Sequence, residues 1–274
     1  MADPALDAFF AALWADYERV APRVAALRGA LEARGERVVN DHVAFRTFAG
    51  APLGIAALEP HLLALGYHRF EPYAFEDKHL DAWAYLHDAP GAPRVFLSEL
   101  RRGALSPAAE RVIDGLLAQV DPARVARADV LWAGPLWEPV PFAVYEALAA
   151  ESEYAGWLAA LGLRANHFTV SVNHLATLPT LDALLAAVEA AGAVISEAGG
   201  RVKGGPAARL EQASTRADRA PVAFADGERE IPTCYYEFAR RYPDADGALY
   251  QGFVPASASR LFESTHRHAP GGRP

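Results

Sequence analysis

Apolar and polar positions repeat with two different periods along the chain, which predicts a mixed α and β protein. Residues 4–34 carry apolar side chains at spacings of three and four, typical of amphipathic helices, with a break at Pro22. From residue 40 the spacing changes to two, so Val43 and Phe45 face one way while His42 and Arg46 face the other. The sequence therefore predicts a helical leader followed by a strand with His42 and Arg46 on one face.

The same succession of elements then appears twice. After the first strand we predict a helix over 56–65 and strands over 82–87 and 94–100. A helix that begins at Ser106 and a mainly helical stretch over 121–160, broken by several prolines, are expected to follow. A second alternating strand, 165–172, carries His167. It precedes further predicted elements, namely a helix over 180–192 and strands over 209–214, 222–225 and 234–239, the last of which contains Glu237.

Each half thus contains a strand with a histidine, a helix, several strands and a strand with a glutamate, Glu99 or Glu237. A duplicated βαβββ unit is typical of the vicinal-oxygen-chelate architecture, an α+β fold in which two modules curl around a shared metal cavity. We expect one catalytic domain over 1–274. Its expected parts are a helical leader (1–36), a first module (37–120), a helical connector (121–163) and a second module with a C-terminal segment (164–274).

Composition and charge narrow the class of protein. The chain has 274 residues, 52% of them hydrophobic, and a net charge of −8, which argues against a nucleic-acid partner. Cys234 is the single cysteine, so a disulfide framework and a cysteine-rich zinc site are excluded. The N-terminus has no basic region of the signal-peptide type, and no apolar stretch approaches the ~18 residues of a membrane span. We therefore predict a cytoplasmic protein without a membrane partner.

Two histidines and one glutamate form a candidate metal site. His42 and His167 each follow a polar residue on an alternating strand, and Glu237 lies on a strand expected to be largely buried. A buried carboxylate is unfavourable unless it is paired or metal-bound. Two imidazoles and one carboxylate suit non-haem Fe(II), because they leave positions open for substrate and dioxygen. Core histidines and a buried ion pair of Glu237 with Arg240 or Arg216 are the alternatives.

Two further expectations concern the neighbours of this site. Glu99 is the carboxylate of the first module that corresponds to Glu237, and we expect it beside the ligands or facing the substrate, with a fourth metal ligand or a structural ion pair as alternatives. Tyr235 or Tyr236 is expected to flank Glu237 on the opposite face of its strand.

Six blocks of sequence in the same order resemble the 2-oxoadipate dioxygenase/decarboxylase family. They are NDHVAFRTF (40–48), DKHLDAWAYLHD (77–88) with PRVFLSEL (93–100), ANHFTVSVNHL (165–175), LEQASTRAD (210–218), IPTCYYEFARRYP (231–243) and YQGFVPASASRLFEST (250–265). The resemblance implies an iron(II) enzyme of lysine catabolism with a vicinal-oxygen-chelate-like core and ligands at His42, His167 and Glu237. The implied reaction converts 2-oxoadipate and O2 to 2-hydroxyglutarate and CO2.

The resemblance also implies that Arg46 engages a substrate carboxylate. On a strand, Arg46 lies about 13 Å along from His42 on the same face, and its guanidinium can reach back toward the metal. A bidentate contact with a carboxylate suits this planar group, and an ion pair within the protein is the alternative. Further candidate substrate contacts are Gln212, Ser214 and Arg216 in the second module and Ser257 near the C-terminus. This chain is shorter than many members, which carry an extra segment in the C-terminal part, so we expect residues that close the pocket there to be missing or replaced.

Two other functions fit the same fold class. A metal-dependent isomerase or lyase would use Glu99 as a fourth ligand and would work without oxygen. A non-catalytic small-molecule-binding protein would not need the two histidines and the glutamate. The sequence does not decide the oligomeric state, the product stereochemistry or the chain length of the 2-oxo acid.

Overall fold

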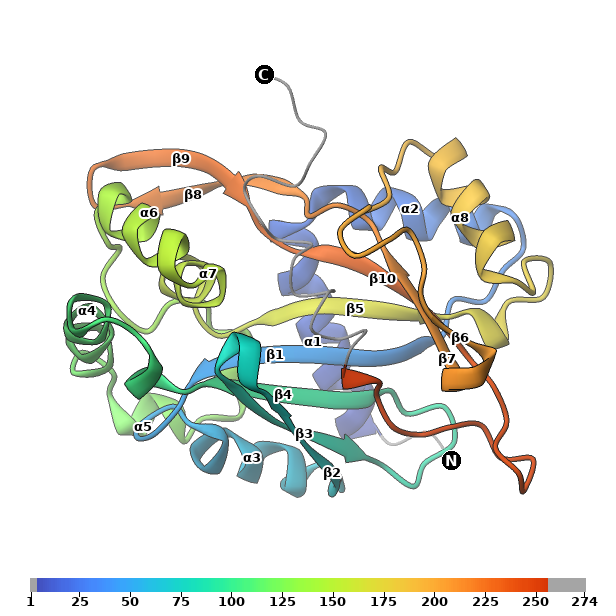
Figure 1. Ribbon diagram of the computed structural model, residues 1–274, viewed down its shortest axis with the longest axis horizontal. Coiled ribbons are helices and arrows are strands. Elements are labelled where there is room, and N and C mark those ends of the chain that lie inside the picture. The colour runs from blue at the N-terminus through green and yellow to red at the C-terminus, as the bar shows by residue number, and fades with distance from the viewer. Residues whose placement is uncertain (1–3, 256–274) are drawn as a thin grey trace.

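The computed structural model describes residues 4–255, and Figure 1 shows their arrangement. The α-helices are α1 (Pro4–Val20), α2 (Pro22–Ala33), α3 (Ile55–Ala64), α4 (Pro107–Leu117), α5 (Pro122–Val125), α6 (Phe142–Glu151), α7 (Glu153–Leu161) and α8 (Leu181–Ala190). The strands are β1 (Asn40–Phe48), β2 (His68–Phe75), β3 (Leu80–Leu86), β4 (Arg94–Leu100), β5 (Ala165–Ser171), β6 (Lys203–Gly205), β7 (Leu210–Ser214), β8 (Arg219–Phe224), β9 (Gly227–Pro232) and β10 (Tyr235–Arg241).

One eight-stranded sheet forms the centre of the described chain. Its strand order is β2-β3-β4-β1-β5-β10-β7-β6, and β8 and β9 form a separate hairpin. β1 and β5 are antiparallel neighbours at the middle of the sheet. Each also pairs with a parallel strand on its outer side, β1 with β4 and β5 with β10. The two histidine-bearing strands therefore lie side by side where the two halves of the sheet meet.

The sheet contains the same arrangement twice. In the first half, β1 is followed by α3 and then by β2, β3 and β4; in the second, β5 is followed by α8, β6, β7 and β10, with the β8-β9 hairpin inserted before the last strand. Reading outward from the centre, the orders β1-β4-β3-β2 and β5-β10-β7-β6 correspond strand by strand. The predicted α+β duplication is thus present in the structure.

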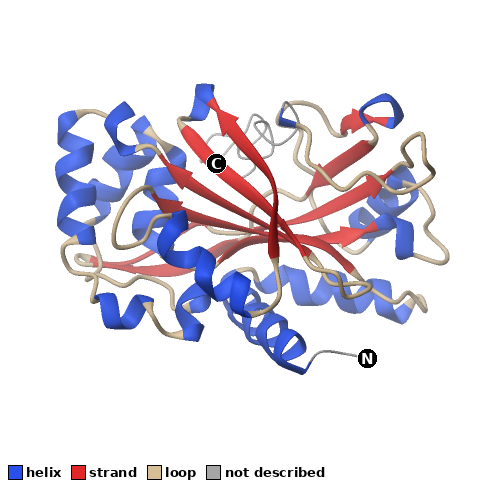
Figure 2. Cartoon of the chain, turned by 90° about the horizontal axis from the view of Figure 1, so that it is seen from below, coloured by secondary structure: helices blue, strands red, loops and turns tan. Residues whose placement is uncertain are grey.

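Helix α1 packs on one face of the sheet. Trp14 and Tyr17 of α1 pack against Phe168 of β5, with ring centroids 5.0 Å apart in both pairs. Figure 2 shows the N-terminal helix running across this face of the twisted sheet. Because side chains alternate along a strand, the neighbours of Phe168, including His167, point to the other face. The amphipathic leader therefore fixes which side of β5 is available for a site.

The pattern of apolar and polar positions did not predict strands β2, β6 and β9. Most side chains of β2 are exposed and it contains Pro72, which suits a sheet edge but gives no alternation of apolar positions. β6 has only three residues, two of them glycines. β9 belongs to a largely exposed hairpin outside the main sheet. These strands are held by pairing with a neighbour rather than by burial of an apolar face.

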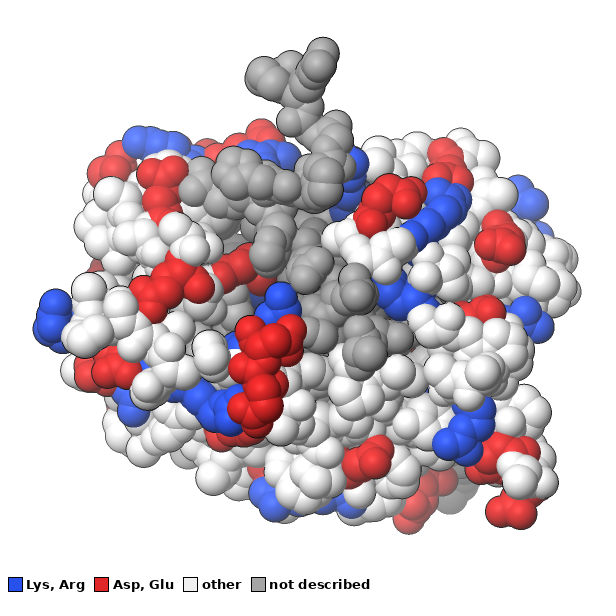
Figure 3. Space-filling model, viewed as in Figure 1, with Lys and Arg blue, Asp and Glu red and all other residues white. Residues whose placement is uncertain are grey.

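The surface agrees with the charge balance of the sequence. In Figure 3, acidic and basic side chains of the described residues are interspersed over the visible face rather than gathered by sign. None of the helices within residues 4–255 is long and apolar enough to cross a membrane.

Candidate metal and substrate site

The three predicted metal ligands meet on the face of the sheet that α1 leaves uncovered. In the strand register, His42 of β1 pairs with Thr169 of β5, and Thr169 pairs with Glu237 of β10. Paired residues point to the same face, so His42 and Glu237 flank Thr169. His167 lies two residues before Thr169 and therefore shares this face.

The geometry of the three side chains suits a metal ion. One ligand atom from each of His42, His167 and Glu237 lies within 4.8 Å of the others, and all three residues are buried. Nε2 of His42 is 3.3 Å from Oε1 of Glu237, and Nε2 of His167 is 3.3 Å from Oε2. Both imidazoles thus direct the same ring nitrogen at one carboxylate, which is how two histidines and a glutamate share a cation.

Neighbouring side chains fix the orientation of both imidazoles. Nδ1 of His42 lies 2.8 Å from Oδ1 of Asp41, and Nδ1 of His167 lies 3.1 Å from Oδ1 of Asn166. If each Nδ1–H donates to its partner, each Nε2 presents a lone pair to a carboxylate oxygen of Glu237. Lone pairs that face one another repel unless a proton or a metal ion lies between them. The donor set of the described residues therefore fits a divalent metal ion.

The pKa values agree with this arrangement. Burial lowers the pKa of His167 to about 3, so its imidazole is neutral at pH 7. Burial would also lower the pKa of His42, but the carboxylates of Glu237 and Asp41 outweigh it and raise this pKa. Burial would raise the pKa of Glu237, yet His167 and His42 lower it, so the carboxylate is ionised. A metal ion would displace the proton that His42 shares with its acidic neighbours.

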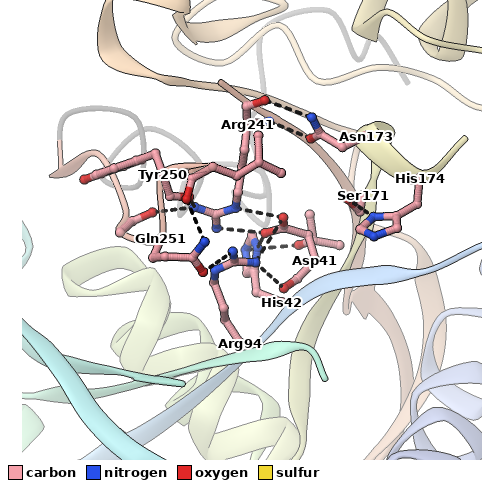
Figure 4. A network of polar contacts seen from close by, with 12 residues as sticks. Asp41, His42, Arg94, Ser171, Asn173, His174, Arg241, Tyr250 and Gln251 are labelled. Carbon is pink, nitrogen blue, oxygen red and sulfur yellow. Dashed lines mark hydrogen bonds and ion pairs between the residues drawn. The ribbon is translucent and has the colours of Figure 1, made fainter. Parts of the chain in front are cut away.

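A second carboxylate, Asp41, organises one end of the site (Figure 4). The register of β1 and β5 shifts between Asn40 and His42. This shift lets the Asp41 side chain point to the same side of the sheet as the His42 side chain. Arg241 donates to both of its oxygens at 2.8 Å, and Arg94 lies 3.4 Å from one of them. Burial would raise the pKa of Asp41, but Arg241 and the other partners lower it well below its ordinary value.

The same network holds the segment that follows β10. Arg241 donates through Nη1 to the carbonyl oxygens of Tyr250 and Gly252, at 2.9 and 2.7 Å. Gln251 accepts from Arg94 at 2.5 Å. The ring of Phe253 then lies edge-on to His42, with centroids 4.8 Å apart. An apolar ring therefore covers one side of the candidate metal ligand.

Arg46 occupies the opposite end of the site. Its side chain is 1% exposed, and its guanidinium lies 3.2 Å from Glu153 and 5.0 Å from the ring centroids of Tyr154 and Trp157, all from α7. The ion pair that the sequence left as an alternative is therefore present. It leaves Arg46 on the metal-facing side, because Arg46 follows His42 at an even spacing.

Comparison with known proteins places the chain in a family. A sequence model of the 2-oxoadipate dioxygenase/decarboxylase family matches residues 9–247. The chain belongs to this family. Two plant 2-oxoadipate dioxygenase/decarboxylases, from rice and Arabidopsis thaliana, are 32% and 33% identical to it over 255 residues, which is 84% of this chain and 70% and 69% of theirs. The rice protein is described as chloroplastic or amyloplastic and the Arabidopsis protein as chloroplastic.

Solved structures agree with this assignment. Hydroxyglutarate synthase from rice in complex with 2-oxoadipate has a TM-score of 0.89 and 28% identity, covering 98% of this chain and 95% of that one. A Shewanella frigidimarina protein described as a hydrolase has a TM-score of 0.87 and 46% identity, covering 91% and 98%. A Ralstonia eutropha protein assigned to the glyoxalase superfamily has a TM-score of 0.77 and 25% identity, covering 90% and 85%. The predictions of an oxygenase-class enzyme and a vicinal-oxygen-chelate core are confirmed.

In this 2-oxoadipate dioxygenase/decarboxylase family member, two of the four further predicted substrate contacts lie at the site. Gln212 donates to Glu237 at 2.7 Å, and Ser214 pairs with Glu237 across β7 and β10. Arg216 instead lines a separate cavity with Arg23 and Cys234, and its role in substrate binding stays a prediction. Ser257 lies outside the described residues.

Glu99 is not near the triad. Its register partner is Thr47, an odd number of residues from His42, so Glu99 points to the opposite face of the sheet. There Oε2 of Glu99 accepts from the backbone N–H of Ile55 at 2.7 Å, at the first turn of α3. By register, Phe96 is the first-module residue that corresponds to Glu237. The expectation that Glu99 faces the substrate or supports the ligands was therefore wrong.

The alternative ion pair of Glu237 also does not form within the described residues. Arg240 stacks on Tyr242 at 5.0 Å, and the partners of Glu237 are His42, His167 and Gln212. Arg241, which sequence reasoning did not single out, also lies on the metal-facing side, where it contacts Asp41. Strand periodicity could have found it, because residues 237, 239 and 241 share one face.

Proposed function

We propose that the chain is a single catalytic domain that binds Fe(II) through His42, His167 and Glu237. It would convert 2-oxoadipate and O2 to 2-hydroxyglutarate and CO2. The observation that carries the proposal is the buried set of two imidazoles and one carboxylate, with ligand atoms within 4.8 Å of one another. Two histidines and one carboxylate leave open metal positions, the arrangement of non-haem Fe(II) oxygenases.

The proposed net reaction balances without a further reactant. The bond between the 2-oxo carbon and its carboxylate breaks and releases CO2. One atom of O2 enters the new carboxylate of the five-carbon product, and the other becomes its hydroxyl group. Bound Fe(II) would supply the chelation of the 2-oxo acid and the activation of dioxygen.

The residues of the chain supply position, charge and exclusion of water. Asp41 and Asn166 hold the two imidazoles with Nε2 toward the metal. Arg46 provides a buried cation for a substrate carboxylate. A carboxylate bound to Arg46 would either replace Glu153 as its partner or share the guanidinium group with Glu153. Phe253 shields His42 from water on one side.

The choice of 2-oxoadipate rests on relatives. The rice enzyme in complex with this compound is similar over 98% of the chain, and both plant proteins carry the name of the reaction. A role in lysine degradation and a cytoplasmic location stay predictions. The alternative function of a metal-dependent isomerase or lyase required Glu99 as a fourth ligand. Glu99 lies on the other face of the sheet and cannot take that role, so this alternative is not favoured.

Oxygen uptake tests the proposal directly. The protein is loaded with Fe(II) under anaerobic conditions, mixed with aerobic buffer and 2-oxoadipate, and the product is identified by mass spectrometry. We expect one O2 consumed for each 2-hydroxyglutarate formed, and no uptake by a Zn(II)-loaded sample. Bound iron without oxygen uptake on 2-oxoadipate or on 2-oxo acids of other chain lengths would overturn the oxygenase proposal for this chain.

A further inference from the structure

Tyr235 lies directly against one of the proposed metal ligands. It pairs with His167 in the β10-β5 register and precedes Glu237 by two residues, so it faces the metal site. The two aromatic rings are stacked, with centroids 4.6 Å apart and an interplanar angle of 23°. The tyrosine is 1% exposed. The prediction from sequence, that Tyr235 or Tyr236 flanks Glu237 on the opposite face of its strand, holds for Tyr236, which contacts Trp14 of α1.

The hydroxyl group of Tyr235 has no hydrogen-bond partner among the described residues. Burying a hydroxyl without a partner is unfavourable, whereas a phenylalanine ring would stack on His167 equally well. Packing therefore explains the ring of Tyr235 but not its oxygen. A bound molecule that accepts a hydrogen bond would explain it.

The strand register places Tyr235 one row from Glu237, in the direction of Arg46. His42, Thr169 and Glu237 form one row across the three central strands. The next row in the direction of Arg46 contains Ala44, His167 and Tyr235. Arg46 follows one row further along β1, on the same face. A ligand that extended from the metal toward Arg46 would therefore pass Tyr235.

We propose that Tyr235 is a substrate-binding residue whose hydroxyl group donates a hydrogen bond to a carboxylate oxygen of the 2-oxo acid, between the metal triad and Arg46. This inference rests on the proposed function. A phenol is an uncharged donor at neutral pH, and its hydrogen bond to a carboxylate is stronger than one to a neutral acceptor. The backbone carbonyl of Tyr235 accepts from the Tyr17 hydroxyl of α1, so the strand that presents the ring is held in place.

The neighbouring tyrosine offers a matched control. Tyr236 is equally buried, and its hydroxyl group also has no hydrogen-bond partner among the described residues. Its ring points to the helix-covered face, 6.0 Å from Trp14. Tyr235→Phe and Tyr236→Phe therefore each remove one buried, unpaired oxygen, from opposite faces of the same strand.

The test measures binding of 2-oxoadipate to Zn(II)-loaded proteins by calorimetry, so that no turnover occurs. We expect Tyr235→Phe to weaken substrate binding by about tenfold to a hundredfold, the range of a hydrogen bond to a charged group. Its Kd for Zn(II) should match that of the wild type, and its Tm should not fall below that of the wild type. Tyr236→Phe should bind substrate as the wild type does.

The outcomes separate this inference from the function on which it rests. Equal binding by the wild type and Tyr235→Phe would overturn the role of Tyr235 and leave the proposed substrate intact. A loss of Zn(II) affinity with unchanged substrate affinity would also overturn it, since the ring would then act only on His167. If the wild type does not bind 2-oxoadipate, the proposed substrate is wrong and the role proposed for Tyr235 is wrong as well.

Discussion

Arg241 donates to both carboxylate oxygens of Asp41, and that carboxylate in turn contacts Nδ1 of His42. The two paired side chains are 1% and 2% exposed. A buried ion pair contributes little net stability, because removing both charges from water offsets their attraction. The pair instead orients His42 and, through the carbonyl oxygens of Tyr250 and Gly252, holds the segment that carries Phe253.

Replacement of Asp41 should weaken metal binding. Asp41→Asn keeps an oxygen for Nδ1 of His42 but loses the charge that orients this ring, so we expect about tenfold to hundredfold weaker binding of Zn(II) or Co(II). Competition with a chromogenic chelator measures this affinity. Asp88→Asn is the control, because Asp88 lines the cavity next to Asp41 but its side chain is 95% exposed. Equal metal affinity in both variants would contradict the role given to Asp41.

The triad itself is tested by removing one ligand at a time. His42→Ala, His167→Ala and Glu237→Ala should each abolish stoichiometric metal binding and oxygen uptake, with retained secondary structure by circular dichroism. His61→Ala should leave metal content and turnover unchanged, because Nε2 of His61 contacts the carbonyl of Val125 on the helical side, 2.8 Å away. Wild-type turnover in any ligand variant would rule out the proposed site.

Strand periodicity predicted the parts of the site that lie on long, buried strands. Alternation placed His42 with Arg46 on one face of β1, and polar neighbours marked both histidines, where the structure has Asp41 and Asn166 as their partners. Short or exposed strands such as β6 and β2 carry no such signal, because pairing with neighbours rather than burial holds them.

The errors came from register, which spacing within one segment does not determine. Glu99 and Glu237 each lie on the last strand of a module, but Glu99 is offset to the opposite face, and Phe96 occupies the position that corresponds to Glu237. Contacts between segments that are far apart in the sequence could not be predicted from spacing either. Arg241 meets Asp41 across 200 positions of sequence, and this contact needs the pairing of β1, β5 and β10.

Substitution of Arg46 should affect substrate rather than metal. Arg46→Lys keeps the charge but loses the planar pair of donors, so we expect KM for 2-oxoadipate to rise about tenfold or more. The affinity for Zn(II) should stay within about twofold of the wild type, because Arg46 contacts Glu153 and aromatic rings rather than a ligand. Steady-state oxygen uptake gives KM and kcat separately. An unchanged KM would show that Arg46 acts only in the ion pair with Glu153.

Glu36 offers a prediction of stability that is independent of the reaction. Its carboxylate accepts from the backbone N–H groups of Ala176 and Thr177, at 2.6 and 2.7 Å, and from the Thr177 hydroxyl at 2.5 Å. These contacts join the leader to the segment after β5. Burial alone would raise the pKa of Glu36, but these donors lower it below its ordinary value of 4.5. The ionised form is therefore the one that stabilises the fold.

Glu36→Gln should lower the free energy of unfolding by about 2 kcal/mol at pH 7, since hydrogen bonds to a charged acceptor are lost. A lowered folded-state pKa gives stability that is complete above about pH 4.5 and is lost as pH falls through the folded pKa. The difference between wild type and variant, measured by urea unfolding, should therefore shrink below that pH. Glu32→Gln, which removes an exposed pair with Arg28, should change stability by about 0.5 kcal/mol or less. A pH-independent difference for Glu36→Gln would show that packing, not charge, makes Glu36 stabilising.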